Sequence, residues 1–185
     1  SKVVNYFDWL GSQHSSENEP RERIKVAYSA IKKHEKKLID LMIKGTDEVV
    51  GLKDLPGINA IGGFENEKRA GLISIYSNNV DSVEIVDQLR LKGIRVHIRK
   101  DDHYSGTILR PLELKSCVRV SICHYNSKEE VLKFLSAMQE ICSWLISKER
   151  SLYLKIKEVS AIVTGGASGL GLATAREFLE KGARV

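Results

Sequence analysis

The sequence feature that most restricts the fold lies near the end of the chain. Residues 159–163 form an almost continuous apolar run, as in a buried parallel strand, and lead into a glycine-rich stretch over residues 164–171. A helical pattern follows over residues 172–181 and ends at Gly182. This order predicts the opening of a βαβ unit, whose second strand would begin at residues 183–185.

The spacing of the glycines gives this turn a chemical meaning. Glycines have no Cβ, so a pyrophosphate can approach the backbone amides at the start of a helix. Residues 164–171 also match the T-G-x-x-x-G-[IL]-G pattern, and the segment resembles the cofactor turn of short-chain dehydrogenases, particularly the 3-hydroxyacyl-CoA dehydrogenase branch. The resemblance implies NAD(H) or NADP(H) contacts from Gly165, Ser168, Gly169, Leu170 and Gly171.

The dehydrogenase resemblance covers only this incomplete Rossmann-type βα tail. The acidic residue that grips the adenine ribose is expected about 20 residues beyond the turn, which is past Val185. Two Tyr-x-x-x-Lys spacings occur, beginning at Tyr28 and Tyr153, but both precede the glycine turn and so lie in the wrong order for the family. We therefore expect nucleotide binding to be weak or absent.

Composition limits the other classes of partner. The 185 residues are 42% hydrophobic, enough for one core of ordinary size or one domain plus an attached piece. The net charge of +5 is spread along the chain, and its densest stretch, residues 32–37, lies on a helical pattern, which favours a solvated surface over a nucleic-acid site. No apolar run is long enough to predict a membrane span. We expect no metal site.

The N-terminal residues and the cysteines predict the localisation. The first residues carry no secretory signal pattern. Cys117, Cys123 and Cys142 are an odd, unclustered set, which argues against a disulfide framework. We expect an intracellular protein of the cytoplasm or the mitochondrial matrix.

The longer first part of the chain alternates helical and strand patterns. We expect helices over residues 20–44, 80–92 and 127–148, strands over 71–76, 94–98 and 116–122, and a polar loop over 99–111. Ser127 and Glu130 have the spacing of a capping box. This pattern predicts an α+β domain over residues 1–148, a linker over 149–158 and the βα tail over 159–185, with strands packed under the first and last of these helices.

Residues 117–131 carry a second resemblance. They read Cys-Val-Arg-Val-Ser-Ile-Cys-His-Tyr-Asn-Ser-Lys-Glu-Glu-Val. This run resembles the arginine-x-serine, tyrosine-asparagine-threonine and glutamate-glutamate stretch of class V aminotransferases, and is most similar to the cysteine desulfurase and selenocysteine lyase group. The upstream patterns at residues 34–38, 69–76 and 89–96 follow in the family order. The resemblance implies the small α+β domain of a pyridoxal-phosphate (PLP)-dependent transferase.

By position, the resemblance assigns three binding residues. Arg119 matches the arginine that holds the substrate α-carboxylate, Arg99 a second active-site arginine, and His103 the histidine of the loop between them. Spacing alone would favour a surface ion pair for these arginines, with His124 on the same stretch. Tyr104 stands where desulfurases have a nucleophilic cysteine, and Asp101-Asp102 replaces a glycine-containing step, so sulfur extraction through this loop is not expected.

The resemblance leaves the chain without a reaction of its own. The lysine that forms the Schiff base with pyridoxal phosphate belongs to the family's large domain, so we assign no catalytic residue and expect the cofactor only with that domain. The expected partner is an amino-acid substrate, and a homodimer is considered. The alternatives are a dehydrogenase with this domain as an appendage, a non-catalytic module, and two mis-joined genes or a laboratory fusion.

Overall fold

The computed structural model describes residues 1–152, 160–164 and 169–184, and the side chains of residues 145–152 are not described. The chain divides into two compact units, Ser1–Cys142 and Ser143–Val185, which are considered separately. Helix α5 begins in the first unit and continues into the second.

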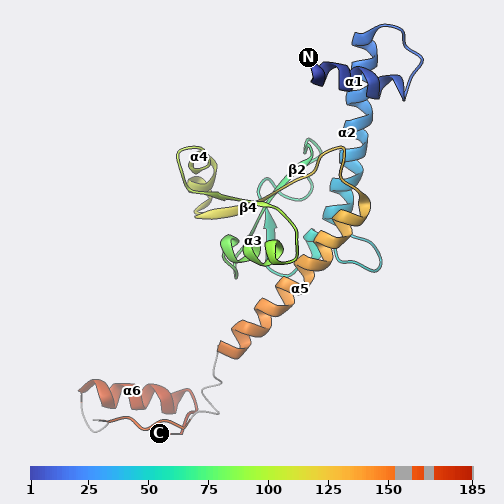
Figure 1. Ribbon diagram of the computed structural model, residues 1–185. Helices are drawn as coiled ribbons and strands as arrows, with labels where there is room; N and C mark the ends of the chain where they lie inside the picture. Colours follow the sequence, from blue (N-terminus) through green and yellow to red (C-terminus); the bar gives the residue numbers. More distant parts are fainter. Residues whose placement is uncertain (153–159, 165–168, 185) are drawn as a thin grey trace. The chain divides into compact units, whose positions relative to one another are not determined.

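The first unit is the α+β domain expected from the sequence (Figure 1). Its elements are α1 (Lys2–Ser12), α2 (Pro20–Lys44), a 3-10 turn at Leu52–Asp54, β1 (Ile58–Ala60), β2 (Leu72–Ser77), α3 (Ser82–Leu91), β3 (His97–Lys100), α4 (Gly106–Leu109), a 3-10 turn at Arg110–Leu112, β4 (Ser116–Ser121) and α5 (Lys128–Leu152).

The four strands form one antiparallel sheet in the order β1-β2-β4-β3. Ile73 lies opposite Val120 and Ile75 opposite Val118, so strand alternation places these four side chains on one face. All four are buried, and α3 packs against β3 and β4. The buried residues of α2 and of the first half of α5 complete this core: Ala27, Leu38, Ile39, Met42, Ile43, Val131, Phe134, Leu135, Ala137, Met138 and Ile141.

Local signals explain where the long helices begin and end. Pro20 occupies the first turn of α2, and Gly45, with φ 73°, follows its last residue. The capping box predicted at the start of α5 is confirmed: the Glu130 amide donates to Ser127 Oγ (3.2 Å), and the Ser127 amide donates to the Glu130 carboxylate (2.9 Å).

Helix α1 was not predicted from the sequence, and it packs closely on α2. A Cβ at Gly11 would lie 1.9 Å from the carbonyl oxygen of Arg23, so only glycine permits this approach. The Arg23 guanidinium forms a two-pronged ion pair with Asp8, at 2.6 and 3.1 Å. Phe7 stacks on Tyr28 with the ring centroids 4.9 Å apart.

The region around β3 differs from the prediction. The strand expected over residues 94–98 begins only at His97 and ends at Lys100, inside the predicted loop. Gly93, with φ 72°, and the hydrogen bond from the Ile94 amide to the Leu89 carbonyl turn the chain back on the end of α3 before it joins the sheet. The rest of the predicted loop contains α4, and the sequence patterns did not predict β1.

The second unit contains α6 (Gly169–Glu180), which begins three residues before the predicted helix start. The described part of the predicted strand, residues 160–163, forms one isolated parallel bridge, Ser160 with Arg184, and the Ala161 amide donates to the Arg184 carbonyl (2.8 Å). Val159 and Val185 lie outside the described residues. A bridge of this kind around α6 has the order of a βαβ unit.

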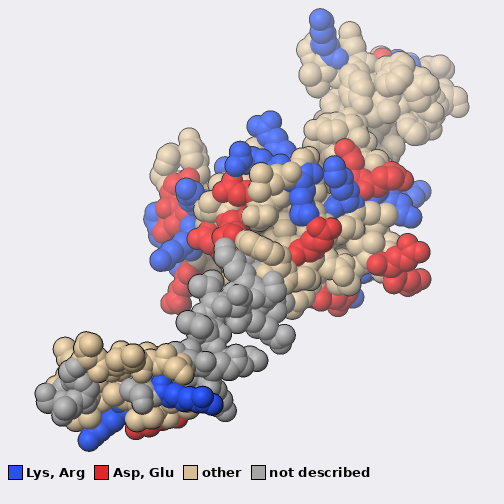
Figure 2. Space-filling view, turned by 60° about the horizontal axis from the view of Figure 1, so that its bottom comes forward, with Lys and Arg blue, Asp and Glu red and all other residues tan. Residues whose placement is uncertain are grey.

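None of the helices in the described ranges combines the length and apolar character needed to cross a bilayer. On the face shown in Figure 2, Lys and Arg side chains of the first unit are interspersed with Asp and Glu.

Candidate substrate-binding face

The polar face of the sheet brings together residues from three strands. Arg119 on β4 lies opposite Ser74 on β2 and opposite His97 on β3, and Arg99 lies opposite Cys117. Because these residues alternate with the buried apolar set, they occupy the other face of the sheet. Arg99 and Arg119, predicted from the resemblance as two anion-binding residues, therefore lie on adjacent strands and share a face.

Arg119 has an unsatisfied hydrogen-bond donor. Its Nε is buried and finds no acceptor in the described part of the structure. A buried donor without an acceptor is costly, and most such groups in native proteins have a partner. The planar guanidinium matches a carboxylate in two-pronged geometry. The arrangement suits an acceptor supplied by a ligand.

Cys117 lies between the two arginines. Burial raises the pKa of its thiol, while a hydrogen bond with Ser74 and the charges of Arg99 and Arg119 act in the opposite direction. Because burial is the larger influence, the thiol stays protonated at neutral pH and is a poor nucleophile. The place of Cys117 between the arginines follows from the register of β3 and β4.

The Asp101-Asp102 pair fastens the loop that follows β3. Asp101 forms an ion pair with Arg110, at 2.6 Å. The Asp102 Oδ1 accepts from the amides of Ser105 (2.8 Å) and Tyr104 (2.9 Å). These two hydrogen bonds, followed by the charges of His103 and Arg99, hold the pKa of Asp102 below its usual range. Both carboxylates thus have local structural partners.

His103 lies on this loop, and its ring centroid is 4.1 Å from that of Tyr104. Both side chains are exposed. The loop begins after Lys100, the last residue of β3, so His103 follows the end of the strand that carries Arg99.

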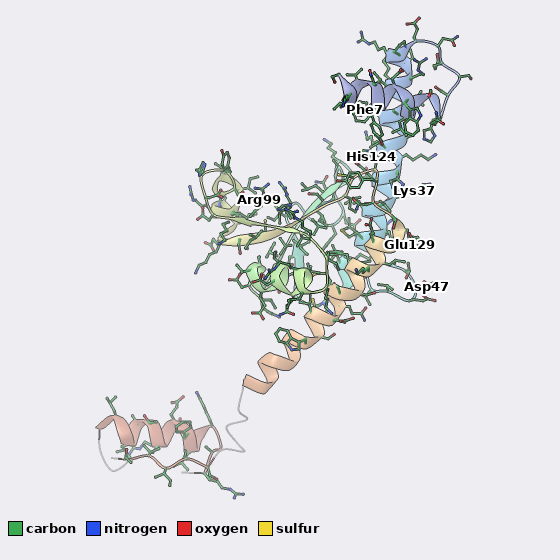
Figure 3. All side chains as sticks on the ribbon, viewed as in Figure 1. Phe7, Lys37, Asp47, Arg99, His124 and Glu129 are labelled. Atoms are coloured by element: carbon green, nitrogen blue, oxygen red, sulfur yellow. The ribbon has the colours of Figure 1, made fainter. Side chains whose placement is uncertain are left out.

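His124 does not join this group. It follows the end of β4, whereas Arg99 faces Cys117 near the start of that strand, and Figure 3 shows the two labelled residues well apart. The His124 Nε2 pairs instead with the hydroxyl of Tyr6 on α1, at 2.9 Å. Its position on the same sequence stretch as Arg119 is therefore not evidence of a shared site.

Arg69 also has an unsatisfied donor, and it was not predicted as a site residue from the sequence. Its Nε is also buried without an acceptor among the described residues, and burial lowers the pKa of the guanidinium. Its only sequence signal is its position just before β2, within a stretch noted for the family order. The Arg69 Nη2 donates to the Gly63 carbonyl oxygen.

The predicted nucleotide turn is only partly described. Gly165 and Ser168 lie outside the described residues. Gly169 adopts φ 57°, Leu170 is 88% exposed, and Gly171 lies in the first turn of α6. Within the described ranges, no group of three or more His, Cys, Asp or Glu side chains is placed to hold a metal ion.

Comparison with known proteins identifies the first unit. A family model described as Aminotransferase class-V matches residues 13–134. "Probable cysteine desulfurase 1" of Mycobacterium leprae (strain TN) is 28% identical over 117 residues, which cover 63% of this chain and 18% of that protein. "Probable cysteine desulfurase" of Pyrococcus abyssi (strain GE5 / Orsay) is 28% identical over 130 residues, which cover 68% and 29% respectively.

Solved structures agree on the fold. The apo structure of cysteine desulfurase from Thermococcus onnurineus NA1 superposes with a TM-score of 0.55 and 26% identity, covering 68% of this chain and 29% of that one. Cysteine desulfurase CsdA from Escherichia coli gives a TM-score of 0.51 at 18% identity, covering 70% and 32%. The chain therefore spans less than a third of the length of these four proteins.

Proposed function

Because the chain belongs to the class V aminotransferase family, we propose that its first unit binds the carboxylate of an amino-acid substrate for a pyridoxal-phosphate enzyme. The observation that carries this proposal is the buried Arg119 Nε, which has no acceptor among the described residues and lies on a polar sheet face shared with Arg99.

Arg119 is the proposed clamp for the α-carboxylate. Its side chain is half-buried, so part of the water that would screen its charge is excluded. A carboxylate ligand would gain a charge-assisted hydrogen bond with the guanidinium group. Ser74 and His97, opposite Arg119 on either side, fix the position of its strand.

Arg99 and His103 are proposed to bound the same site. Arg99 adds a second positive charge on the adjacent strand, which favours an anionic group near Arg119. The Asp102 cap and the Asp101–Arg110 ion pair hold the loop that carries His103.

Tyr104 narrows the proposed chemistry. The resemblance places the sulfur-accepting cysteine of desulfurases at this position, and a phenol cannot accept persulfide sulfur. Cys117 is buried, and Cys123 follows the end of β4. Neither cysteine therefore stands at the position of the sulfur-accepting cysteine. We therefore propose amino-acid chemistry that does not transfer sulfur through this loop.

The cofactor itself would be held largely by residues beyond this chain. The resemblance assigns the Schiff-base lysine to the large domain, and the relatives are more than three times as long as the part matched here. When bound, pyridoxal phosphate supplies an electron sink. The residues described here fit the substrate's carboxylate, which they would bind and orient.

A hybrid protein tests the proposal. Residues 13–134 of this chain would replace the matching segment of the Pyrococcus abyssi relative, whose remainder supplies the cofactor lysine. We expect the hybrid to bind pyridoxal phosphate, measured by visible absorbance, and to change its spectrum when amino acids are added.

Arg119→Gln in the hybrid should leave the cofactor absorbance intact and raise the amino-acid concentration needed for the spectral change by about tenfold or more. Lys68→Gln, an exposed change outside the polar face, is the matched control. An Arg119→Gln hybrid that responds at the original concentration would refute the role of Arg119.

A second proposal concerns the last segment: weak nucleotide binding by the turn over residues 164–171. The parallel bridge between Ser160 and Arg184 around α6 supports it, because this connectivity is that of a βαβ unit. Titration of the chain with NADH, followed by fluorescence, tests it. Saturable binding that is lost in Gly169→Val would support the proposal, and an unsaturated titration at millimolar NADH would remove it.

A further inference from the structure

A cavity of about 300 Å³ lies in the first unit, away from Arg99 and His103. It opens where β3 fails to extend along β4. The pairing of β3 with β4 reaches His97 opposite Arg119 and stops, whereas β4 continues beside β2 to Ser121. Residues 94–96 are not paired with Val120 and Ser121, the last two residues of β4, and residues of both segments line the cavity.

The floor of this cavity is the core of the unit. Met42 from α2, Val120 and Ile122 from β4 and its end, and Val131 and Phe134 from α5 all line it and are at most 6% exposed. A ligand entering the cavity would thus remove apolar surface from water, which is the main source of affinity for a small molecule.

The rim of the cavity is positively charged. Arg95 and Lys133 line it, and neither makes an ion pair within 4 Å with a described residue. Glu130 is the acidic residue of the lining, and its carboxylate already accepts from the Ser127 amide (2.9 Å) and Asn126 Nδ2 (3.0 Å). The charge of Lys133 acts on this carboxylate, so Glu130 offsets one of the two positive charges of the rim. Arg95 leaves the rim with one net positive charge, which attracts an anion.

We infer that this cavity binds a small amphipathic carboxylate, with its apolar body on the core floor and its carboxylate at Arg95 and Lys133. The inference stands apart from the proposed substrate face, because no residue of the Arg99, His103 and Arg119 set lines the cavity. A cavity of this volume is at the small end of ligand sites, which suits a short aliphatic or aromatic acid.

The test uses the full chain and octanoate as the probe. Binding is followed by the amide shifts of Val96, Ile122 and Val131 in nitrogen–proton correlation spectra. We expect saturable shifts confined to the cavity, with 1-octanol and acetate each binding about tenfold more weakly because each lacks one of the two recognised parts.

Charge variants separate recognition from mere apolar contact. Arg95→Gln and Lys133→Gln should each weaken octanoate binding about fivefold and leave octanol binding unchanged. Lys68→Gln, an exposed lysine that does not line the cavity, should change neither.

Three results would overturn the inference. The first is an octanoate titration that does not saturate, and the second is a set of shifts centred outside the cavity. The third is octanol binding as tightly as octanoate, which comes from the unaltered chain and so remains informative even if a variant fails to fold.

Discussion

The two units differ in how they bury their apolar side chains. The first encloses large residues completely, among them Met42, Ile73 and Leu135. In the described residues of the second, the buried side chains are Ala175 and Ala183, whereas Ile162 is 97% exposed. Yet the second unit carries the more explicit sequence motif. A short glycine pattern specifies a local turn, but a stable domain also needs apolar surface to be covered.

The largest expected effect tests this contrast directly. Leu135→Ala, in the core of the first unit, should lower the free energy of unfolding by about 2–5 kcal/mol because it leaves a cavity among packed side chains. Leu179→Ala, at a position 56% exposed on α6, should change it by less than about 0.5 kcal/mol.

Urea unfolding of the two variants, followed by circular dichroism, measures both effects. Equal losses would mean that the second unit contributes a core comparable to that of the first, and the contrast between the units would then fail.

The next effect concerns the contact of α1 with α2. Gly11→Ala would place a Cβ 1.9 Å from the Arg23 carbonyl oxygen, so α1 must shift, at a cost of about 1–3 kcal/mol. Gly63→Ala is a useful comparison, because a Cβ there meets no atom within 4 Å although its φ is 72°. Thermal unfolding measures the stability of both variants. A Gly11→Ala protein as stable as the original would contradict the close packing.

A smaller effect compares the hydroxyl groups near the N-terminal ends of α5 and α6. Ser127→Ala removes the capping hydroxyl of α5 and should cost about 1 kcal/mol. The Thr174 hydroxyl in α6 donates to the Leu170 carbonyl oxygen of the same helix. Thr174→Ala should therefore change the free energy of unfolding very little. The denaturant midpoints of the two variants measure both effects. An unchanged midpoint in Ser127→Ala would show that the capping box does not stabilise the first unit.

The smallest effect is kinetic and probes the interior of the first unit. Burial raises the pKa of Cys117 and of Cys142, so both thiols should react slowly with a disulfide reagent at neutral pH, and half-buried Cys123 should react first. Peptide mass mapping of the labelled sites gives the order. Labelling of Cys117 as fast as Cys123 would mean that the polar face opens readily.

The same two pKa shifts fix a pH trend. A thiol whose pKa is raised on folding binds its proton more tightly in the folded chain than in the unfolded chain. Its contribution to stability is therefore complete below the ordinary thiol pKa. That contribution is lost as the pH rises through the pKa of the folded state. Unfolding free energies should therefore fall on the alkaline side, and Cys117→Ser should reduce the slope.

Much of the fold could be read from periodicity and capping. The helical pattern over residues 20–44 predicted α2, and Ser127 with Glu130 predicted the start of α5, because these signals are local. Helix α1 was missed, since its packing depends on Gly11 meeting a backbone 12 residues away, at Arg23. The shift of β3 was missed because the turn at Gly93 sets where pairing begins, and alternation alone does not encode that.

Some features of the candidate site could likewise be predicted from the sequence, and others could not. Arg99 and Arg119 were identified from the family resemblance, and the register shows that they share a face. Two features required the three-dimensional arrangement: the buried Arg119 Nε, which has no acceptor in the described part of the chain, and the position of Cys117 between the arginines. His124 was placed on the same stretch as these residues, but strand direction carries it to the other end of β4, against Tyr6.

The order of the sheet also bears on aggregation. β3 is an outer strand, and three of its residues, His97, Arg99 and Lys100, are basic. Basic side chains on an exposed edge oppose pairing with the same edge of another molecule, because like charges would meet across the new ladder. Removing the charge of Arg99 would weaken this protection as well as the proposed binding face, so a neutral variant at this position is expected to be more prone to self-association.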